Sequence, residues 1–166
     1  MRGWLLDAYP VPEGMRVWLI ADDGRRLTAV EAWRPTAFLK GPRAEADRVV
    51  RWLAGQGVRS ELAATQRTDL MTGAAWDVLA LQVGDAERFL PLMTAAVRRF
   101  PALEFFNADL LPERYWFFET ARHPLARVEA EIEGDALRAM ECRDAIWDVD
   151  YALPPLAILG LRLEEE

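Results

Sequence analysis

The sequence predicts an α+β protein with a ferredoxin-like (RRM-like) βαββαβ core, an N-terminal β-meander and a C-terminal lobe. Two observations lead to this fold class. Between residues 36 and 110, apolar periodicities follow the order strand, helix, strand, strand, helix, strand. Before residue 36, short apolar runs are separated by tight turn signals. We therefore divide the chain into residues 1–35, 36–110 and 111–166.

The opening meander is expected to contain strands over Leu5–Tyr9, Arg16–Ala21 and Arg25–Ala32. Pro10 should end the first strand, because proline cannot donate a ladder hydrogen bond. Asp22-Asp23-Gly24 is a strong hairpin turn, since glycine accepts a positive φ at low cost.

The central core is expected to place helices over Ala44–Gln56 and Ala86–Arg99 on one face of an antiparallel sheet. Gly41-Pro42 should start the first helix and Asp85 should cap the second. The strands of that sheet are predicted over Thr36–Leu39, Val58–Arg67, Ala75–Val83 and Leu103–Phe106.

The remaining segment is expected to form an aromatic helix over Leu111–Ala121, a hairpin and a final apolar strand. The hairpin strands are Leu125–Glu133 and Leu137–Cys142, and the last strand is Ala157–Leu163. A buried-type strand so close to the last residue suggests that the natural protein continues.

The composition favours a cytoplasmic globular protein. Of the 166 residues, 52% are hydrophobic, and seven Trp and seven Phe supply a core. No apolar run approaches the roughly 18 residues that a membrane helix needs, so no membrane partner is expected. Asp7 comes too early for a signal peptide, and the single cysteine, Cys142, allows no internal disulfide.

Catalytic chemistry finds little support in the sequence. His123 is the lone histidine and Ser60 the lone serine, so no persuasive nucleophile arrangement exists, and one His with one Cys cannot form a His/Cys metal site. The net charge of −7 argues against an autonomous, high-affinity nucleic-acid binder. We predict no catalytic residue, metal or cofactor in this chain.

An acidic cluster leaves a small Mg²⁺ enzyme open as an alternative, because Mg²⁺ prefers oxygen ligands. Its members are Asp144, Asp148, Asp150 and the tail Glu164–Glu166. A solvated acidic loop and chain end is the favoured interpretation.

Residues 105–119 are the most unusual stretch, with six aromatic side chains beside an arginine. Aromatics with an arginine can stack single-stranded bases, but most of these rings, including Phe106 and Phe118, are expected in the core. Arg114 and Tyr115 are the best candidates for outward contacts.

The same stretch resembles family B DNA polymerases. Their pattern of aromatic-Asn-x-Asp, then Arg-Tyr-x-aromatic-Glu, then Pro-Leu stands here as Phe106–Leu110, Arg114–Glu119 and Pro124-Leu125. The opening Gly3–Tyr9 is similar to the first strand of that family, and Trp33–Phe38 is similar to its Phe-Arg-Pro segment. These pieces occur in the family's order and span nearly the whole chain.

The resemblance implies a non-catalytic N-terminal region that leads into a ribonuclease H-like 3′–5′ exonuclease domain. Such a region would scaffold the enzyme and contact the template strand of DNA, with the remaining polymerase domains as partners and Mg²⁺ required by the parent enzyme. Leu153–Glu164 is similar to the first exonuclease strand, but Arg162 replaces the metal-binding Asp of its Asp-x-Glu motif and only Glu164 matches.

In archaeal members this region also captures template uracil. By position, the resemblance implies a template pocket lined by Tyr9, Pro35, Val78, Arg114 and Tyr115. The chain departs from the archaeal pattern at Leu111-Pro112 and at Ala75, which favours general template contact over uracil sensing. The alternative is a free-standing ferredoxin-like module that binds a ligand or a partner.

Overall fold

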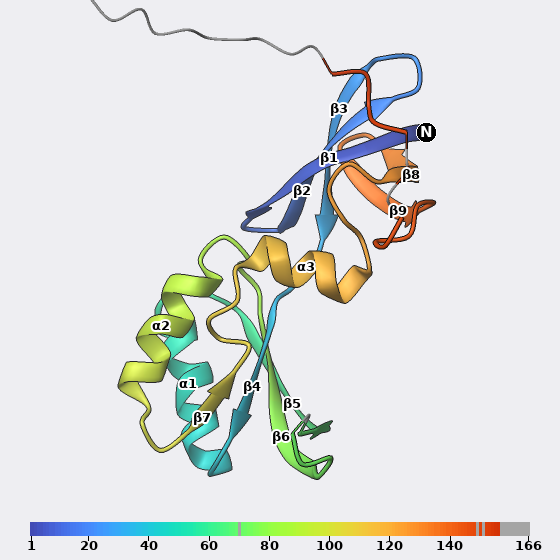
Figure 1. The fold of residues 1–166 in the computed structure, drawn as a ribbon. Coiled ribbons are helices and arrows are strands. Elements are labelled where there is room, and N and C mark those ends of the chain that lie inside the picture. Colours follow the sequence, from blue (N-terminus) through green and yellow to red (C-terminus); the bar gives the residue numbers. More distant parts are fainter. Residues whose placement is uncertain (70, 149, 151, 157–166) are drawn as a thin grey trace, which may run out of the picture.

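The first three strands close into a barrel with a hairpin from the far end of the chain (Figure 1). The computed structural model describes residues 1–69, 71–148, 150 and 152–156. Within them the barrel order is β1-β2-β3-β9-β8, and β3 and β9 are parallel at Val30 and Ala136. Its strands are β1 (Arg2–Val11), β2 (Gly14–Ala21), β3 (Arg26–Ala32), β8 (Arg127–Glu133) and β9 (Ala136–Cys142).

A second sheet is inserted between β3 and the rest of the barrel. Its order is β5-β6-β4-β7, and every neighbouring pair is antiparallel. The inserted elements are β4 (Thr36–Lys40), α1 (Arg43–Gly55), β5 (Ser60–Thr68), β6 (Ala75–Val83), α2 (Phe89–Arg99) and β7 (Glu104–Phe106). Helix α3 (Pro112–Thr120) then crosses between this sheet and the barrel (Figure 1).

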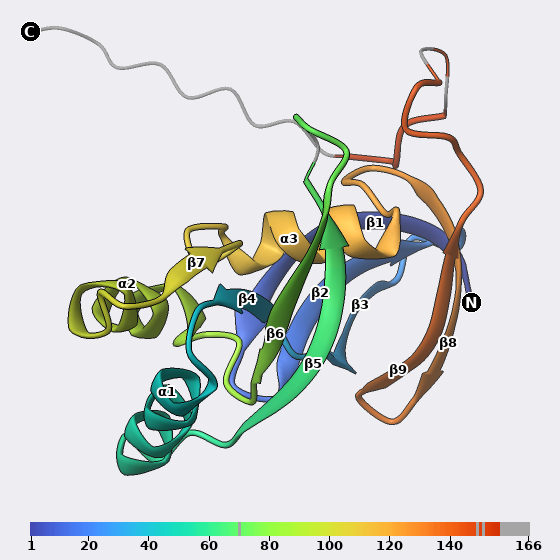
Figure 2. The same ribbon diagram turned by 90° about the horizontal axis from the view of Figure 1, so that it is seen from below.

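Helices α1 and α2 lie on one side of the inserted sheet, and the views of Figures 1 and 2 agree on this. Their buried residues recur at helical spacing, as Val49 and Leu53 do in α1 and Phe89 and Met93 do in α2. They pack against alternate strand residues such as Leu39. The predicted element order between residues 36 and 110 is therefore observed, with both helices on the same face.

The barrel has a separate core that α3 completes. Leu5, Val17 and Leu19 point inward from the strands, and Trp116 of α3 is fully buried among them. Sequence analysis placed residues 1–35 and 111–166 in different units, whereas the structure joins their strands into one barrel. The long insertion between β3 and α3 hides this pairing from any local pattern.

Two local expectations were wrong. Strand β1 runs past Pro10 to Val11, and at that end it pairs only with β2, so proline sits on an edge. Helix α2 begins at Phe89 rather than Ala86, because Asp85 instead caps the preceding turn through a 2.9 Å bond from the Arg88 amide to Asp85 Oδ1.

The turn at residues 22–24 is confirmed: Gly24 has φ +82° and its amide donates to the Ala21 carbonyl at 2.8 Å. The strand expected over Ala157–Leu163 lies outside the described residues. In the part of the chain that the structure describes, no helix is long and apolar enough to cross a membrane.

Candidate functional site: an aromatic groove beneath helix α3

The sheet face opposite α1 and α2 carries a groove of about 600 Å³ that reaches α3. We call it the aromatic groove and define it by the apolar side chains that line it, Phe38, Trp76, Val78, Phe106, Tyr115 and Phe118. Strand alternation creates it. Ala37 and Leu39 of β4 turn into the helix-covered core, so Phe38 between them must face the other side.

Two cations stand over the rings of this face. The Arg67 guanidinium lies 4.4 Å from the Phe38 ring centroid, and Lys40 Nζ lies 3.9 Å from the Trp76 centroid. Trp76 in turn contacts Phe106, with centroids 5.7 Å apart. Rings beside cations can stack a base while the cation binds a phosphate.

Tyr115 forms the inner end of the groove rather than an outward contact. Its side chain is 8% exposed and its ring meets Trp33 edge-on at 5.7 Å. Burial raises the pKa of the Tyr115 phenol and the Glu119 charge adds to the rise, while hydrogen bonds with Asn107 and Thr36 oppose it. The groove therefore presents a neutral phenol.

Helix α3 is fixed to the barrel, which fixes this wall of the groove. Trp116 Nε1 and the Arg122 guanidinium both donate to Glu31 Oε2 on β3, at 2.8 and 2.5 Å. Arg122 also donates to the Met140 carbonyl of β9 at 3.0 Å. On the groove side, Trp33 Nε1 donates to Glu119 Oε2 at 2.6 Å.

The predicted template residues separate into two groups. Val78 and Tyr115 line the groove. Pro35 is buried beside it, with its carbonyl accepting from the Val83 amide, while Arg114 is exposed on α3 and Tyr9 lies on the outside of the barrel. The latter three are not among its described lining residues, and a DNA contact by them stays a prediction.

Two expectations for the aromatic stretch were wrong. Tyr115 was expected to face outward and is buried. Phe118 was expected in the core and is 77% exposed at the rim of the groove. Helix α3 has one face on the barrel and one on the groove, so its four consecutive aromatics diverge. Arg162 and Glu164 lie outside the described residues.

Sequence reasoning missed Phe38, Trp76 and Arg67. Their strands were predicted, and alternation along each strand separates Phe38 from its core neighbours. Only the pairing register brings the three together: Phe38 lies opposite Ala80 of β6 and Phe106 of β7, and Arg67 lies opposite Trp76.

No group of three or more His, Cys, Asp or Glu residues in the described ranges could hold a metal ion. In the acidic cluster, Asp144 accepts from the Arg127 amide at 2.6 Å and Asp148 accepts from the Ala145 amide at 2.8 Å, so both carboxylates already bind backbone amides. Burial raises the pKa of the Cys142 thiol, which disfavours the nucleophilic thiolate.

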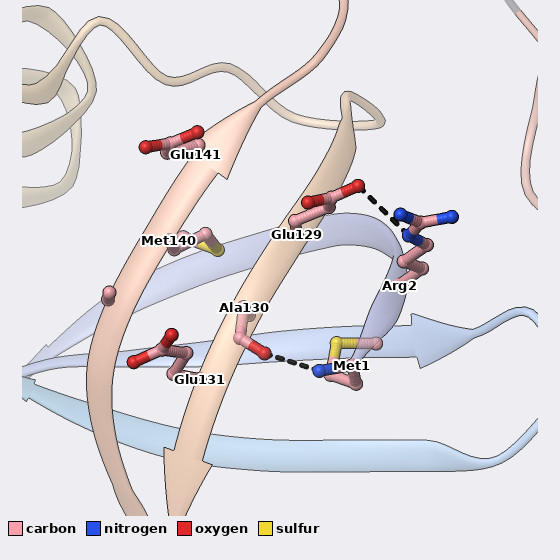
Figure 3. Close-up of a pocket in the computed structure, with 8 residues that line it drawn as sticks. Met1, Arg2, Glu129, Ala130, Glu131, Met140 and Glu141 are labelled. Atoms are coloured by element: carbon pink, nitrogen blue, oxygen red, sulfur yellow. Dashed lines mark hydrogen bonds and ion pairs between the residues drawn. The ribbon is translucent and has the colours of Figure 1, made fainter.

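A second hollow, of about 400 Å³, lies on the barrel wall and is drawn in Figure 3. Most of its charges are already paired. Arg2 pairs with Glu129 at 2.9 Å, Arg143 pairs with Glu129 and Glu141, and the Met1 ammonium donates to the Ala130 carbonyl. With no ring to stack a ligand, it is a weaker site than the aromatic groove.

No family model matches the chain, and no curated protein matches it. Among solved structures, the chain is similar to the family B DNA polymerase from the hyperthermophilic archaeon Pyrobaculum calidifontis, with a TM-score of 0.65 and 22% sequence identity. The match covers 94% of this chain and 21% of the polymerase chain. This chain therefore spans about a fifth of that protein's length, and the likeness inferred from sequence is confirmed at the level of the fold.

Proposed function

We propose that this chain acts as the N-terminal, non-catalytic region of a family B DNA-directed DNA polymerase. In that role it would scaffold the polymerase domains and contact single-stranded template DNA. The shared fold over 94% of the chain supports this assignment. The catalytic domains, and the Mg²⁺ that they require, would lie outside these residues, and the cytoplasm is the expected compartment.

The aromatic groove is the observation that carries the template contact. Single-strand binders combine aromatic platforms for bases with cations that follow the backbone. Here Trp76, Phe106 and Phe118 provide rings and Arg67 provides charge. Lys40 lies over the Trp76 ring and shares its charge with Glu104 at 3.8 Å.

The inserted sheet supports its assignment to the ferredoxin-like class. The order β5-β6-β4-β7, with all pairs antiparallel, is that of a split βαβ unit. RRM domains of this class bind single strands on the face opposite their helices, through aromatics on the sheet. This is an analogy of fold, and the groove chemistry is the stronger support.

The first test is fluorescence anisotropy of a labelled primer–template with a single-stranded template extension, at low and at higher salt. Because the net charge is −7, we expect weak binding that weakens further with salt. Phe118→Ala should reduce the affinity by about 5- to 150-fold, since one stacked base contributes about 1–3 kcal/mol. Phe118 is 77% exposed, so folding should not suffer.

Trp147→Ala is the matched control, because Trp147 is 87% exposed and is not among the lining residues of the groove. Arg67→Gln should lower the salt slope by roughly 0.7, the value for one phosphate contact on a single strand. Equal losses in Phe118→Ala and Trp147→Ala would remove the groove from the proposal. No binding at either salt would leave a scaffold or a free-standing module that binds another partner.

A further inference from the structure

Further hollows lie next to the aromatic groove. A hollow of about 440 Å³ shares Glu119 with it and passes over Trp33 and Arg34 at the junction of barrel and sheet. Another hollow, of about 310 Å³, shares Glu13 and Ala32 with the 440 Å³ hollow and reaches the outside of the barrel. Each hollow shares lining residues with the next, so the three are neighbours, and we call this series of hollows the track.

The track ends where small barrels of this type bind oligomers. The order β1-β2-β3-β9-β8 with parallel β3 and β9, and with α3 between the third and fourth barrel strands, is that of an OB barrel. Such barrels bind on the face of strands two and three, near the loops joining strands one to two and four to five. Here Arg16 lies on strand two, Val30 on strand three, Glu13 in the first loop and Asp135 in the second, and all four line the last hollow.

Arg16 is a donor without a local acceptor. Its Nε is buried and has no hydrogen-bond partner among the described residues, and such a group is costly unless a ligand completes it. Tyr9 lies directly opposite Arg16 in the β1–β2 register, and Trp18 follows two positions along on the same face. These two rings are 40% and 45% exposed.

We propose that the barrel face of Tyr9, Arg16 and Trp18 is a second contact for the same single strand of nucleic acid, reached along this track. Arg16 would donate to a base edge or a phosphodiester oxygen, and Trp18 and Tyr9 would stack bases. The inference rests on the proposed function, because the strand must first occupy the aromatic groove.

The charges along the track predict how this contact behaves. Glu119, Glu13 and Asp135 line it, and Arg34 is already paired with Glu61 at 2.7 Å. A polyanion gains little Coulomb energy there, so the barrel contact depends on stacking and hydrogen bonds. Affinity should therefore rise with strand length while the salt slope changes little.

Oligothymidylates of increasing length test this with the 166-residue chain in anisotropy titrations. A strand of about 5 nucleotides should fill only the groove, and one of about 15 should also reach the barrel, given the usual site sizes of such folds. We expect the longer strand to bind at least 10-fold more tightly. Arg16→Gln or Trp18→Ala should remove most of that gain and leave the short strand unchanged.

Arg138→Gln and Trp147→Ala are the matched controls, since both residues are exposed and line none of the three hollows. The second contact would be overturned if affinity did not rise with strand length, or if the rise persisted in both Arg16→Gln and Trp18→Ala. Binding of the short strand would still uphold the proposed function. If the short strand does not bind at all, both the groove and the track are overturned. If the short strand binds the parent chain but not Trp18→Ala, only the track is overturned.

Discussion

Trp33 Nε1 donates a 2.6 Å hydrogen bond to Oε2 of Glu119, which joins the segment between barrel and sheet to the groove side of α3. The Trp33 ring also meets the buried Tyr115 edge-on. The Trp33 side chain therefore contacts both Glu119 and Tyr115 of α3 and fixes the helix against the junction between barrel and sheet. The geometry of the aromatic groove depends on this contact.

Replacing Trp33 with Phe should keep an aromatic contact with Tyr115 and lose the hydrogen bond. We expect a loss of about 1 kcal/mol in the free energy of unfolding, the usual net contribution of one hydrogen bond. Urea denaturation measures it. Glu119→Gln keeps an acceptor oxygen and should cost clearly less. An equal cost for both variants would mean that the charge of Glu119, rather than the hydrogen bond, is the stabilising feature.

Glu31 and Arg122 should matter more, because their ion pair is largely buried. Their side chains are 22% and 10% exposed, and Glu31 also accepts from Trp116. Glu31→Ala should destabilise the fold by about 3 kcal/mol, since it leaves the Arg122 charge without its partner.

The double variant Glu31→Ala with Arg122→Met should be less destabilised than the sum of the two single variants. Urea denaturation of all three variants gives the coupling free energy. Simple additivity would show that the two side chains stabilise the barrel independently.

Tyr115 should make the fold sensitive to alkali. Its pKa is raised in the folded state, mainly by burial, so the fold favours the protonated phenol. This contribution is complete below the unfolded pKa of about 10 and is lost as the pH rises through the folded value.

Thermal unfolding from pH 8 to 11 should therefore show a loss of stability above about pH 10 that is smaller in Tyr115→Phe. Tyrosinate absorbance should show a phenol that ionises above the usual pKa in the folded protein and that is missing in Tyr115→Phe. A Tyr115→Phe profile that parallels the parent would contradict this account.

Gly14 should tolerate no side chain. It opens β2 with φ +154°, and an added Cβ would lie 2.0 Å from the Glu31 carbonyl oxygen and 2.6 Å from the Trp33 nitrogen, both backbone atoms. Gly14→Ala should cost about 3 kcal/mol or more, by strain and by forced separation of β2 from β3.

Gly24 provides the comparison, because its φ is +82° but no described atom beyond its two chain neighbours lies within 4 Å of its added Cβ. Gly24→Ala should show only the backbone cost of about 1–2 kcal/mol. Similar unfolding midpoints for the two variants in guanidinium would mean that the β2–β3 pair can separate at little cost.

Much of the secondary structure follows from local pattern. The strand over Ala75–Val83 matches its predicted bounds, and the helices over Arg43–Gly55 and Phe89–Arg99 differ from theirs mainly at the ends. Alternation, helical spacing and turn residues act within a few positions, so they predict an element without any information about the rest of the chain. The likeness to family B polymerases was visible for a similar reason, in short segments kept in order.

The candidate site was only partly predictable. Val78 and Tyr115 could be named by position, while Phe38, Trp76 and Arg67 could not, because nothing local shows which strands become neighbours. The divergence of Phe118 and Trp116 on α3 has the same origin: the helix has two different partners, and its sequence shows four aromatics in a row.

The sequence by itself determined the local elements, the turn at Gly24 and the presence of an aromatic stretch beside an arginine. The tertiary structure alone decided that β8 and β9 close the barrel and that an aromatic groove forms beneath α3. The physical reason is range. Backbone preference and side-chain periodicity are set by near neighbours, whereas the groove depends on pairing between separate strands, such as Phe38 with Phe106. Barrel closure depends on pairings between residues more than a hundred positions apart, such as Gly3 with Val128.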